Sequence, residues 1–273
     1  MGAIKNYFKD QFSLNKFTLQ HNDAAQFHLS CWQNNRSSFP LLCVRLILFL
    51  GTIAIVTTSL ILRHEENAGY WFIYMTNWGI VYIMIACGLA CAVSARSYFK
   101  GPIDSAFGLP WYLKLYWAIY NSAICVAFFI TIFYYSLLYG ADYDLDNIVE
   151  DMTYELYPVL DLFVHAINSV LMFILLMTSQ HPSHLLHFTF PVVFAIIYMV
   201  FSIIYYYSGG LDPNGNAWIY PVLDWGNPGL SAGLVFGCAV LLLFLHWFVV
   251  LLSLLRNYLS RKLVGDFNKF TLA

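Results

Sequence analysis

The sequence predicts an all-α membrane protein, a bundle of six transmembrane helices in one domain. Of its 273 residues, 60% are hydrophobic and 10% are charged, whereas a soluble domain carries about 25% charged residues. Six apolar runs are each long enough to cross a bilayer, which takes about 20 residues. No strand-like alternation competes with these runs, and only helices or closed barrels can span lipid.

The predicted spans divide the chain into a membrane domain and two tails. The spans run over Leu41–Leu62, Tyr70–Ser94, Leu113–Leu138, Pro158–Thr178, Leu186–Ser208 and Gly229–Leu255. Residues 1–40 and 256–273 are the predicted N-terminal and C-terminal tails, and 41–255 the transmembrane domain. The first tail lacks the basic start, short apolar run and cleavage site of a signal peptide.

The basic residues predict the orientation in the membrane. All of the 13 Lys and Arg residues except Arg63 fall on the side of the two tails, if Arg45 near the start of the first span snorkels back to that side. By the positive-inside rule, both termini are therefore cytoplasmic. The opposite loops are acidic, most of all residues 142–155, which either form a solvated acidic loop, the favoured interpretation, or bind Ca²⁺.

Composition and spacing also exclude several classes of partner. The net charge of −2 and the absence of a basic stripe exclude a nucleic-acid partner. All 6 cysteines fall in predicted spans or in the N-terminal tail, so no disulfide framework is expected. His181, His184 and His187 are spaced for a metal only if their turn is helical, and a polar loop at headgroup level is favoured. We expect no metal and no cofactor.

One face of the fourth span carries the polar residues that most need an explanation. Asp161, His165 and Asn168 stand at i, i+4 and i+7, which places them on one side of a helix. Ionisable groups inside a span usually face the bundle interior or a wet cavity and are functional candidates. Thr76 in the second span lies at a similar expected depth, roughly 10 Å below the boundary at 1.5 Å per residue.

Thr76 and His165 are the predicted catalytic residues. A hydroxyl beside an imidazole is the minimal nucleophile–base pair for acyl transfer, and either Asp161 or Asn168 can orient the imidazole. The alternative is structural, because a membrane-span threonine commonly bonds backbone and a single histidine is often a packing group. The sequence contains no nucleophile elbow and no His-Glu-x-x-His motif.

A long polar and aromatic segment separates the last two predicted spans. Gly209-Gly210 ends a helix, Asp212-Pro213-Asn214-Gly215 has the composition of a turn, and the aromatic residues are typical of a membrane interface. Residues Tyr220 to Trp225 are predicted to form a short structured lid over the mouth of the bundle.

Several motifs resemble the rolling stone family of multipass membrane proteins. These motifs are Tyr205-Tyr206-Tyr207-Ser208-Gly209-Gly210, Tyr220-Pro221-Val222-Leu223-Asp224-Trp225, Asn227-Pro228-Gly229, His165-Ala166-Ile167-Asn168-Ser169, Cys31-Trp32-Gln33 and Thr76-Asn77-Trp78. The resemblance covers nearly the whole chain. It implies a plasma-membrane protein with a role in myoblast fusion or muscle development.

A more distant resemblance reaches the androgen-induced protein family of six-span enzymes. Tyr74-Met75-Thr76-Asn77 is similar to the segment that carries their intramembrane threonine, and His165 falls about one turn from the position of their histidine. This resemblance implies hydrolysis of fatty acid esters of hydroxy fatty acids, with Thr76 as nucleophile and His165 as base. A small transporter or channel is the third alternative, but no broken-helix pair or inverted repeat supports it.

Overall fold

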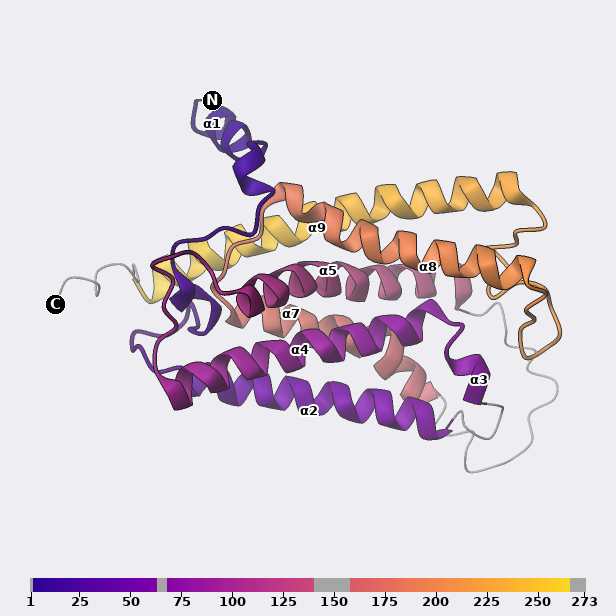
Figure 1. Cartoon of the computed structure of the whole chain (residues 1–273), viewed down its shortest axis with the longest axis horizontal. Coiled ribbons are helices and arrows are strands. Elements are labelled where there is room, and N and C mark those ends of the chain that lie inside the picture. The colour runs from indigo at the N-terminus through magenta and orange to yellow at the C-terminus, as the bar shows by residue number, and fades with distance from the viewer. Residues whose placement is uncertain (1, 63–67, 140–157, 266–273) are drawn as a thin grey trace.

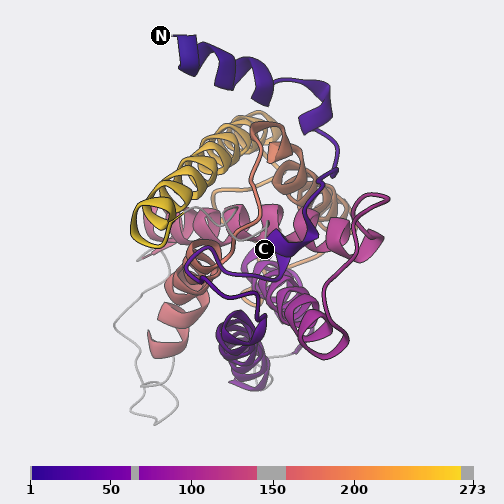
Figure 2. The same cartoon turned by 90° about the vertical axis from the view of Figure 1, so that its left-hand side faces the viewer.

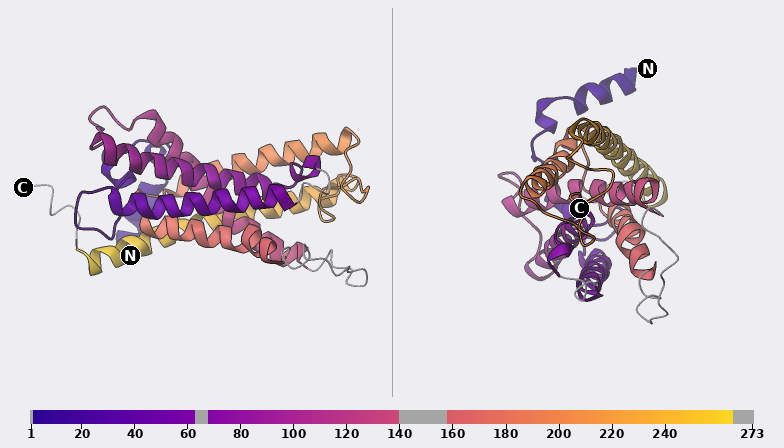
Figure 3. Two further views of the ribbon diagram at one scale, coloured as in Figure 1. Left: turned by 90° about the horizontal axis from the view of Figure 1, so that it is seen from below. Right: turned by 90° about the vertical axis from the view of Figure 1, so that its right-hand side faces the viewer.

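The computed structural model describes residues 2–62, 68–139 and 158–265, and confirms the predicted all-α bundle. Six helices in this part of the chain are long and apolar enough to cross a membrane. They lie side by side along the long axis of the molecule (Figures 1 and 3). The described residues contain no strand beyond an isolated bridge between Tyr220 and Leu223. The acidic segment 142–155 lies outside the described residues.

The observed spans agree with the predicted ones to within a few residues at most ends. They are α2 (Phe39–Leu62), α4 (Met75–Lys100), α5 (Trp111–Phe133) with the π-helical turn η4 (Tyr134–Leu138), Pro158–Thr178 with the π-helical turn η6 (Phe163–Ile167) and α7 (Asn168–Thr178), η7 (Leu185–Phe188) with α8 (Thr189–Tyr207), and α9 (Pro228–Leu263). The last helix continues past the predicted end at Leu255.

Helix α5 forms the centre of the bundle (Figure 1). From Tyr120 to Ala127 every one of its residues is buried, so it is covered on all sides by α4, α7, α8 and α9. A helix that is apolar all round is suited to such a position. Gly79 of α4 faces α5 so closely that a Cβ atom there would collide with Ile130.

The N-terminal segment closes one end of the bundle, which we call the terminal end because the described part of the chain begins and ends there (Figure 1). The helix η2 (Ala24–Phe27) places the Phe27 ring, fully buried, against Tyr116, Trp117 and His181 at centroid distances of 6.5, 5.3 and 5.1 Å. The indole of Trp32 donates a hydrogen bond to the carbonyl of Met177. Residues 24–38 of the predicted tail therefore pack as part of the fold.

The snorkelling predicted for Arg45 is wrong, because its guanidinium is fully buried at the terminal end. Its hydrogen bonds tie α2 to four other segments of the chain. Nη1 donates to the Phe27 carbonyl at 2.8 Å, the Ala90 carbonyl at 3.1 Å and the Ser94 hydroxyl at 2.8 Å, and Nη2 donates to the hydroxyls of Tyr116 and Ser179, each at 3.2 Å. Both Nη groups thus find acceptors inside the protein, although Nε finds none among the described residues, and this removes most of the reason to snorkel.

A second buried arginine lies at the same end. Arg256 donates from Nη1 to the Leu176 carbonyl at 3.0 Å and from Nη2 to the carbonyls of Gln180 and His181 at 3.3 and 3.1 Å. Leu176 lies in the last turn of α7, where the helix dipole favours a cation, and Gln180 and His181 follow the helix. Within the described residues neither guanidinium forms an ion pair.

The histidine-rich connection is buried rather than a polar headgroup-level loop. His181 is fully buried and stacks on Tyr116 at a centroid distance of 5.2 Å, with Tyr120 at 4.2 Å. His184 and His187 pack around Trp117 at centroid distances of 5.6 and 5.0 Å. The aromatic rings of α5 and η2 shield this segment from water, which the sequence spacing alone does not reveal.

The second predicted span, Tyr70–Ser94, is interrupted. The chain forms a short helix α3 (Ala68–Trp71), leaves helical geometry at residues 72–74 and resumes in α4. The break is stabilised by side chains that bond the freed carbonyls. Asn77 Nδ2 donates to Trp71 at 2.7 Å, and the Trp78 indole donates to Phe72 at 2.6 Å. Thr76 consequently lies in the first turn of its helix and not two turns inside it.

Candidate functional site

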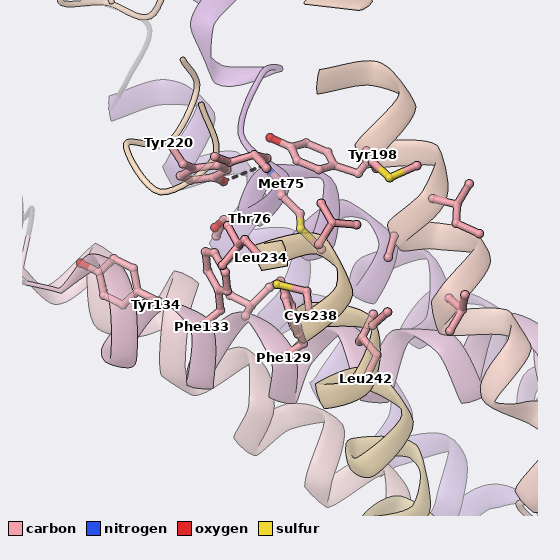
Figure 4. Close-up of a pocket in the computed structure, with 18 of the residues that line it drawn as sticks. Met75, Thr76, Phe129, Phe133, Tyr134, Tyr198, Tyr220, Leu234, Cys238 and Leu242 are labelled. Atoms are coloured by element: carbon pink, nitrogen blue, oxygen red, sulfur yellow. Dashed lines mark hydrogen bonds between the residues drawn. The ribbon is translucent and has the colours of Figure 1, made fainter. Parts of the chain in front are cut away.

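A large apolar cavity lies between α8 and α9 near the end of the bundle opposite the termini, which we call the loop end. It holds about 880 Å³ of empty space, counting the part open to the surroundings. Helix α5 forms its floor with Phe129, Ile130 and Phe133. Along α9 the lining runs from Leu234 to Leu242, about 12 Å of helix at 1.5 Å per residue. Figure 4 shows this arrangement.

The segment between α8 and α9 closes the cavity at the loop end, as the sequence predicted for residues 220–225. Tyr220 and Leu223 both line the cavity and form the isolated bridge. Asp224 holds the following turn, because its carboxylate accepts from the Gly226 N–H and the Asn227 side chain, each at 2.8 Å. The Trp225 indole donates to Ser202 of α8 at 3.1 Å, which fixes the segment to the bundle.

Two tyrosines hold the start of α4 at the mouth of the cavity. The Tyr220 hydroxyl accepts from the Met75 N–H at 2.9 Å, one of the backbone donors that the first turn of a helix leaves unpaired. The Tyr198 hydroxyl donates to the Ile73 carbonyl at 2.8 Å. Burial raises the pKa of Tyr220, so its hydroxyl stays protonated at neutral pH. Both contacts position the turn that carries Thr76.

Thr76 lines the cavity at this polar end, beside the ring of Tyr220 (Figure 4). Its neighbours along the rest of the cavity are aliphatic, aromatic or sulfur-containing side chains. The site therefore combines one threonine hydroxyl and tyrosine hydroxyls at one end with a long apolar interior. This polarity suits a single-chain amphiphile with its polar group at the loop end.

His165 lies behind the cavity wall, paired with Asp161 as the i, i+4 spacing predicted. Its Nδ1 atom is 2.9 Å from Asp161 Oδ1 and 3.1 Å from the Asp161 carbonyl oxygen. The π-helical turn η6 carries His165, and such turns are frequent at functional sites. The second π-helical turn, η4, carries Tyr134, whose ring stacks on the imidazole at a centroid distance of 3.5 Å.

Tyr134 links the cavity to the His165–Asp161 pair. Its ring lines the cavity, and its hydroxyl donates to Asp161 Oδ1 at 2.7 Å. Tyr134 was not singled out by the sequence, because its contacts join residues on two different spans. The only signal in the sequence is that Tyr134 lies near the end of the third span, at a depth in the membrane similar to that expected for His165.

Hydroxyl groups on α5 and α7 fix the backbone around His165. Thr131 Oγ1 lies 2.6 Å from both the His165 carbonyl oxygen and the Ser169 hydroxyl. Ser169 donates in turn to the Ala127 carbonyl at 2.8 Å. These bonds satisfy a carbonyl of the π-helical turn and tie the fourth span to α5.

Asn168 does not orient the imidazole. Its side-chain amide is buried near Thr52, Ile55 and Ile83 and donates to the Val164 carbonyl at 2.7 Å. Of the two orienting groups that the sequence left open, the structure pairs Asp161 with His165. Thr76 and His165 themselves form no hydrogen bond with each other, and Tyr134 stands between the cavity and the imidazole.

The described residues contain no cluster of three His, Cys, Asp or Glu side chains arranged for a metal ion. The three histidines of the connection after α7 instead make packing contacts and hydrogen bonds, and the rings of His184 and His187 touch each other at a centroid distance of 5.1 Å. His187 Nδ1 lies 3.1 Å from the Asn121 side chain, and the His184 carbonyl oxygen lies 2.8 Å from His246 Nε2.

Comparison with known proteins agrees with the sequence motifs. The model of the family "Protein rolling stone" matches residues 3–268. The chain belongs to the rolling stone family. It is 28% identical to Protein rolling stone of Drosophila melanogaster over 261 residues, which cover 91% of this chain and 89% of that protein. No solved structure matches.

The motifs that resemble the rolling stone family have defined places in this structure. Tyr220 and Leu223 close the cavity, and Thr76-Asn77-Trp78 form the turn that Tyr198 and Tyr220 hold. Cys31-Trp32-Gln33 seal the terminal end, where Gln33 Oε1 accepts from the Ser30 N–H at 3.1 Å. The rolling stone motifs thus lie at the two ends of the bundle and around His165.

Proposed function

We propose that this protein acts at the plasma membrane in fusion between cells, in the myoblast fusion or muscle development that the rolling stone resemblance implies. The observation that carries the proposal is the family match over residues 3–268. Both termini face the cytoplasm, since the Lys and Arg residues gather at the terminal end. The cavity supports a lipid-linked role, because its apolar walls and single polar end suit a lipid chain.

Expression of this chain in Drosophila myoblasts that lack rolling stone is expected to restore fusion, and Ala239→Trp is expected to abolish that rescue. Ala239 lines the cavity on α9, so an indole at this position fills the space for a lipid chain. Nuclei per myotube are the measurement, with surface expression matched between variants.

The matched control is Leu251→Trp on the same helix, where the side chain is 62% exposed on the outer surface of the bundle. It is expected to rescue fusion like the unmodified chain. Failure of the unmodified chain to rescue fusion contradicts the proposed role. Full rescue by Ala239→Trp contradicts the part assigned to the cavity.

The second candidate function is hydrolysis of a lipid ester inside the membrane, favoured by the Thr76 hydroxyl in the cavity and the His165–Asp161 pair behind it. Thr76 attacks the ester carbonyl carbon, and its proton passes to His165. The imidazole returns the proton to the departing alkoxide, and water then releases the acyl group from Thr76. These reaction steps require the Tyr134 ring to rotate away from the imidazole on which it stacks, so that the proton can pass from Thr76 to His165.

A fluorophosphonate probe tests this second function directly. If Thr76 is a nucleophile activated by His165, the purified protein is labelled, and Thr76→Ala and His165→Ala each lower the labelling rate at least about a hundredfold. Thr57→Ala is the control, because that hydroxyl is exposed and bonds only carbonyls of its own helix. A folded protein that never reacts, or that reacts equally in Thr76→Ala, excludes this mechanism.

A further inference from the structure

The N-terminal helix α1 (Gly2–Gln11) lies outside the bundle and runs across the direction of the spans. Figures 1 and 2 show it beside the terminal end, projecting sideways past the other helices. A helix in this orientation, next to spans that cross a membrane, lies along the plane of the membrane and not through it.

Its position along the spans is fixed by a hydrogen bond. Gln11 is buried at the end of α1, and its Oε1 atom accepts from the Leu185 N–H at 3.3 Å. Leu185 is the first residue of the fifth span, so the end of α1 lies where the apolar layer begins. An ion pair between Lys16 and Asp10, at 3.3 Å, holds the turn that follows.

Phenylalanine side chains project from this helix and the turn behind it. Phe8, Phe12 and Phe17 are 48%, 55% and 49% exposed, and the first two stack at a centroid distance of 6.5 Å. Phe8 and Phe12 are four residues apart, with Phe12 one residue past the end of α1, so the two side chains project from the same side of the helix. Asp10 is also exposed and stands about 160° round the helix from both rings. The two rings and the Asp10 carboxylate thus lie on opposite sides of α1.

The exposed phenylalanines continue a surface that already faces lipid. The fifth span, whose first residue Leu185 bonds Gln11, exposes Val193, Ile197 and Val200 along the outer side of α8. In a six-span protein this side contacts acyl chains. The α1 ring pair extends the same apolar surface outward at the level where the span begins.

We propose that α1 is an interfacial helix, embedded at the boundary between headgroups and acyl chains of the leaflet on the terminal side, with Phe8 and Phe12 among the acyl chains. Helices of this kind bury an apolar face in the boundary and keep lysines at the headgroups. The occupant is the lipid surface itself, which the protein contacts here in addition to its six spans. The helix anchors the segment that seals the terminal end of the bundle.

Photocrosslinking of the full-length protein in phosphatidylcholine nanodiscs tests the proposal. The photoreactive residue p-benzoylphenylalanine replaces Phe12 in one variant and Asn6, exposed on the other side of the helix, in the second, and mass spectrometry identifies the adducts. We expect phospholipid adducts from position 12 at least about tenfold above those from position 6, given the transfer free energy of a phenyl ring. Equal lipid yields at both positions, or adducts mainly to a second copy of the chain, overturn the proposal.

A second measurement does not depend on the probe. Phe8→Asp combined with Phe12→Asp removes the apolar face, and trypsin cleavage after Lys9 is expected to become at least about tenfold faster in nanodiscs. Both side chains are exposed and neither takes part in the buried contact between Gln11 and Leu185, so the six spans remain folded. An unchanged cleavage rate contradicts insertion of this helix.

Discussion

Replacing Arg45 with methionine is expected to destabilise the protein by about 3–5 kcal/mol, because each buried acceptor left without a donor costs about 1–3 kcal/mol. Methionine fills similar space but donates no hydrogen bonds, so the carbonyls of Phe27 and Ala90 and the Ser94 hydroxyl lose their donor inside the protein. Unpaired buried acceptors carry their full desolvation penalty. Thermal unfolding in detergent is expected to show a Tm lowered by about 10 °C.

Two further variants define this effect. Lys100→Met changes an exposed cation at the end of α4 and is expected to shift Tm by no more than about 2 °C. Arg45→Lys keeps the charge but loses the fork that reaches Tyr116 and Ser179 together, so its Tm is expected to fall between the other two. A Tm for Arg45→Met equal to that of Lys100→Met contradicts a structural role for the buried guanidinium.

Arg45 also shows where sequence-based prediction ends for this fold. Apolar run length located all six spans, because crossing a bilayer imposes the same requirement on each helix separately. The direction of a long side chain is not a local property. Whether Arg45 points to water or inward depends on Phe27, Ala90 and Tyr116, which belong to three other segments of the chain.

At the candidate site too, local features could be predicted from the sequence, and contacts between different spans could not. The pairing of Asp161 with His165 follows from helical spacing and was predictable. The role of Tyr134 was not, since it depends on two π-helical turns that face each other across different spans. Likewise, the break before Met75 arises from side-chain bonds of Asn77 and Trp78 to nearby carbonyls, while hydropathy continues across it.

Acidification is expected to destabilise the terminal end between pH 6.5 and 4. Burial, with the nearby charge of Arg45, lowers the pKa of His28 from 6.5 to about 4, and burial lowers the pKa of His184 from 6.5 to about 4. The pKa of His181 is lowered well below 6.5 for the same reason, with Arg45 and Arg256 contributing. Within the described residues, His28 Nδ1 lies 2.9 Å from Ser38 and 3.0 Å from Ser97.

The direction of the effect follows from proton binding in the two states. As pH falls below 6.5, the unfolded chain binds protons on these histidines, but the folded protein does not until about pH 4. The free energy of unfolding therefore decreases through this window, by about 3 kcal/mol for each of His28 and His184. Above pH 6.5 both states are neutral at these positions, so their contribution is constant.

The change in Tm with pH, rather than Tm itself, separates titration from packing. In His28→Gln the side chain at position 28 cannot take up a proton. The fall in Tm between pH 6.5 and 4 is therefore expected to be smaller than in the unmodified protein, by the part that His28 contributes. Ser97→Ala removes a hydrogen-bond partner of the same ring and lowers Tm at every pH, but leaves the histidine to titrate. If both variants keep the full pH dependence, acid sensitivity arises elsewhere. If only His28→Gln loses part of it, the buried neutral imidazole is the group that limits stability in acid.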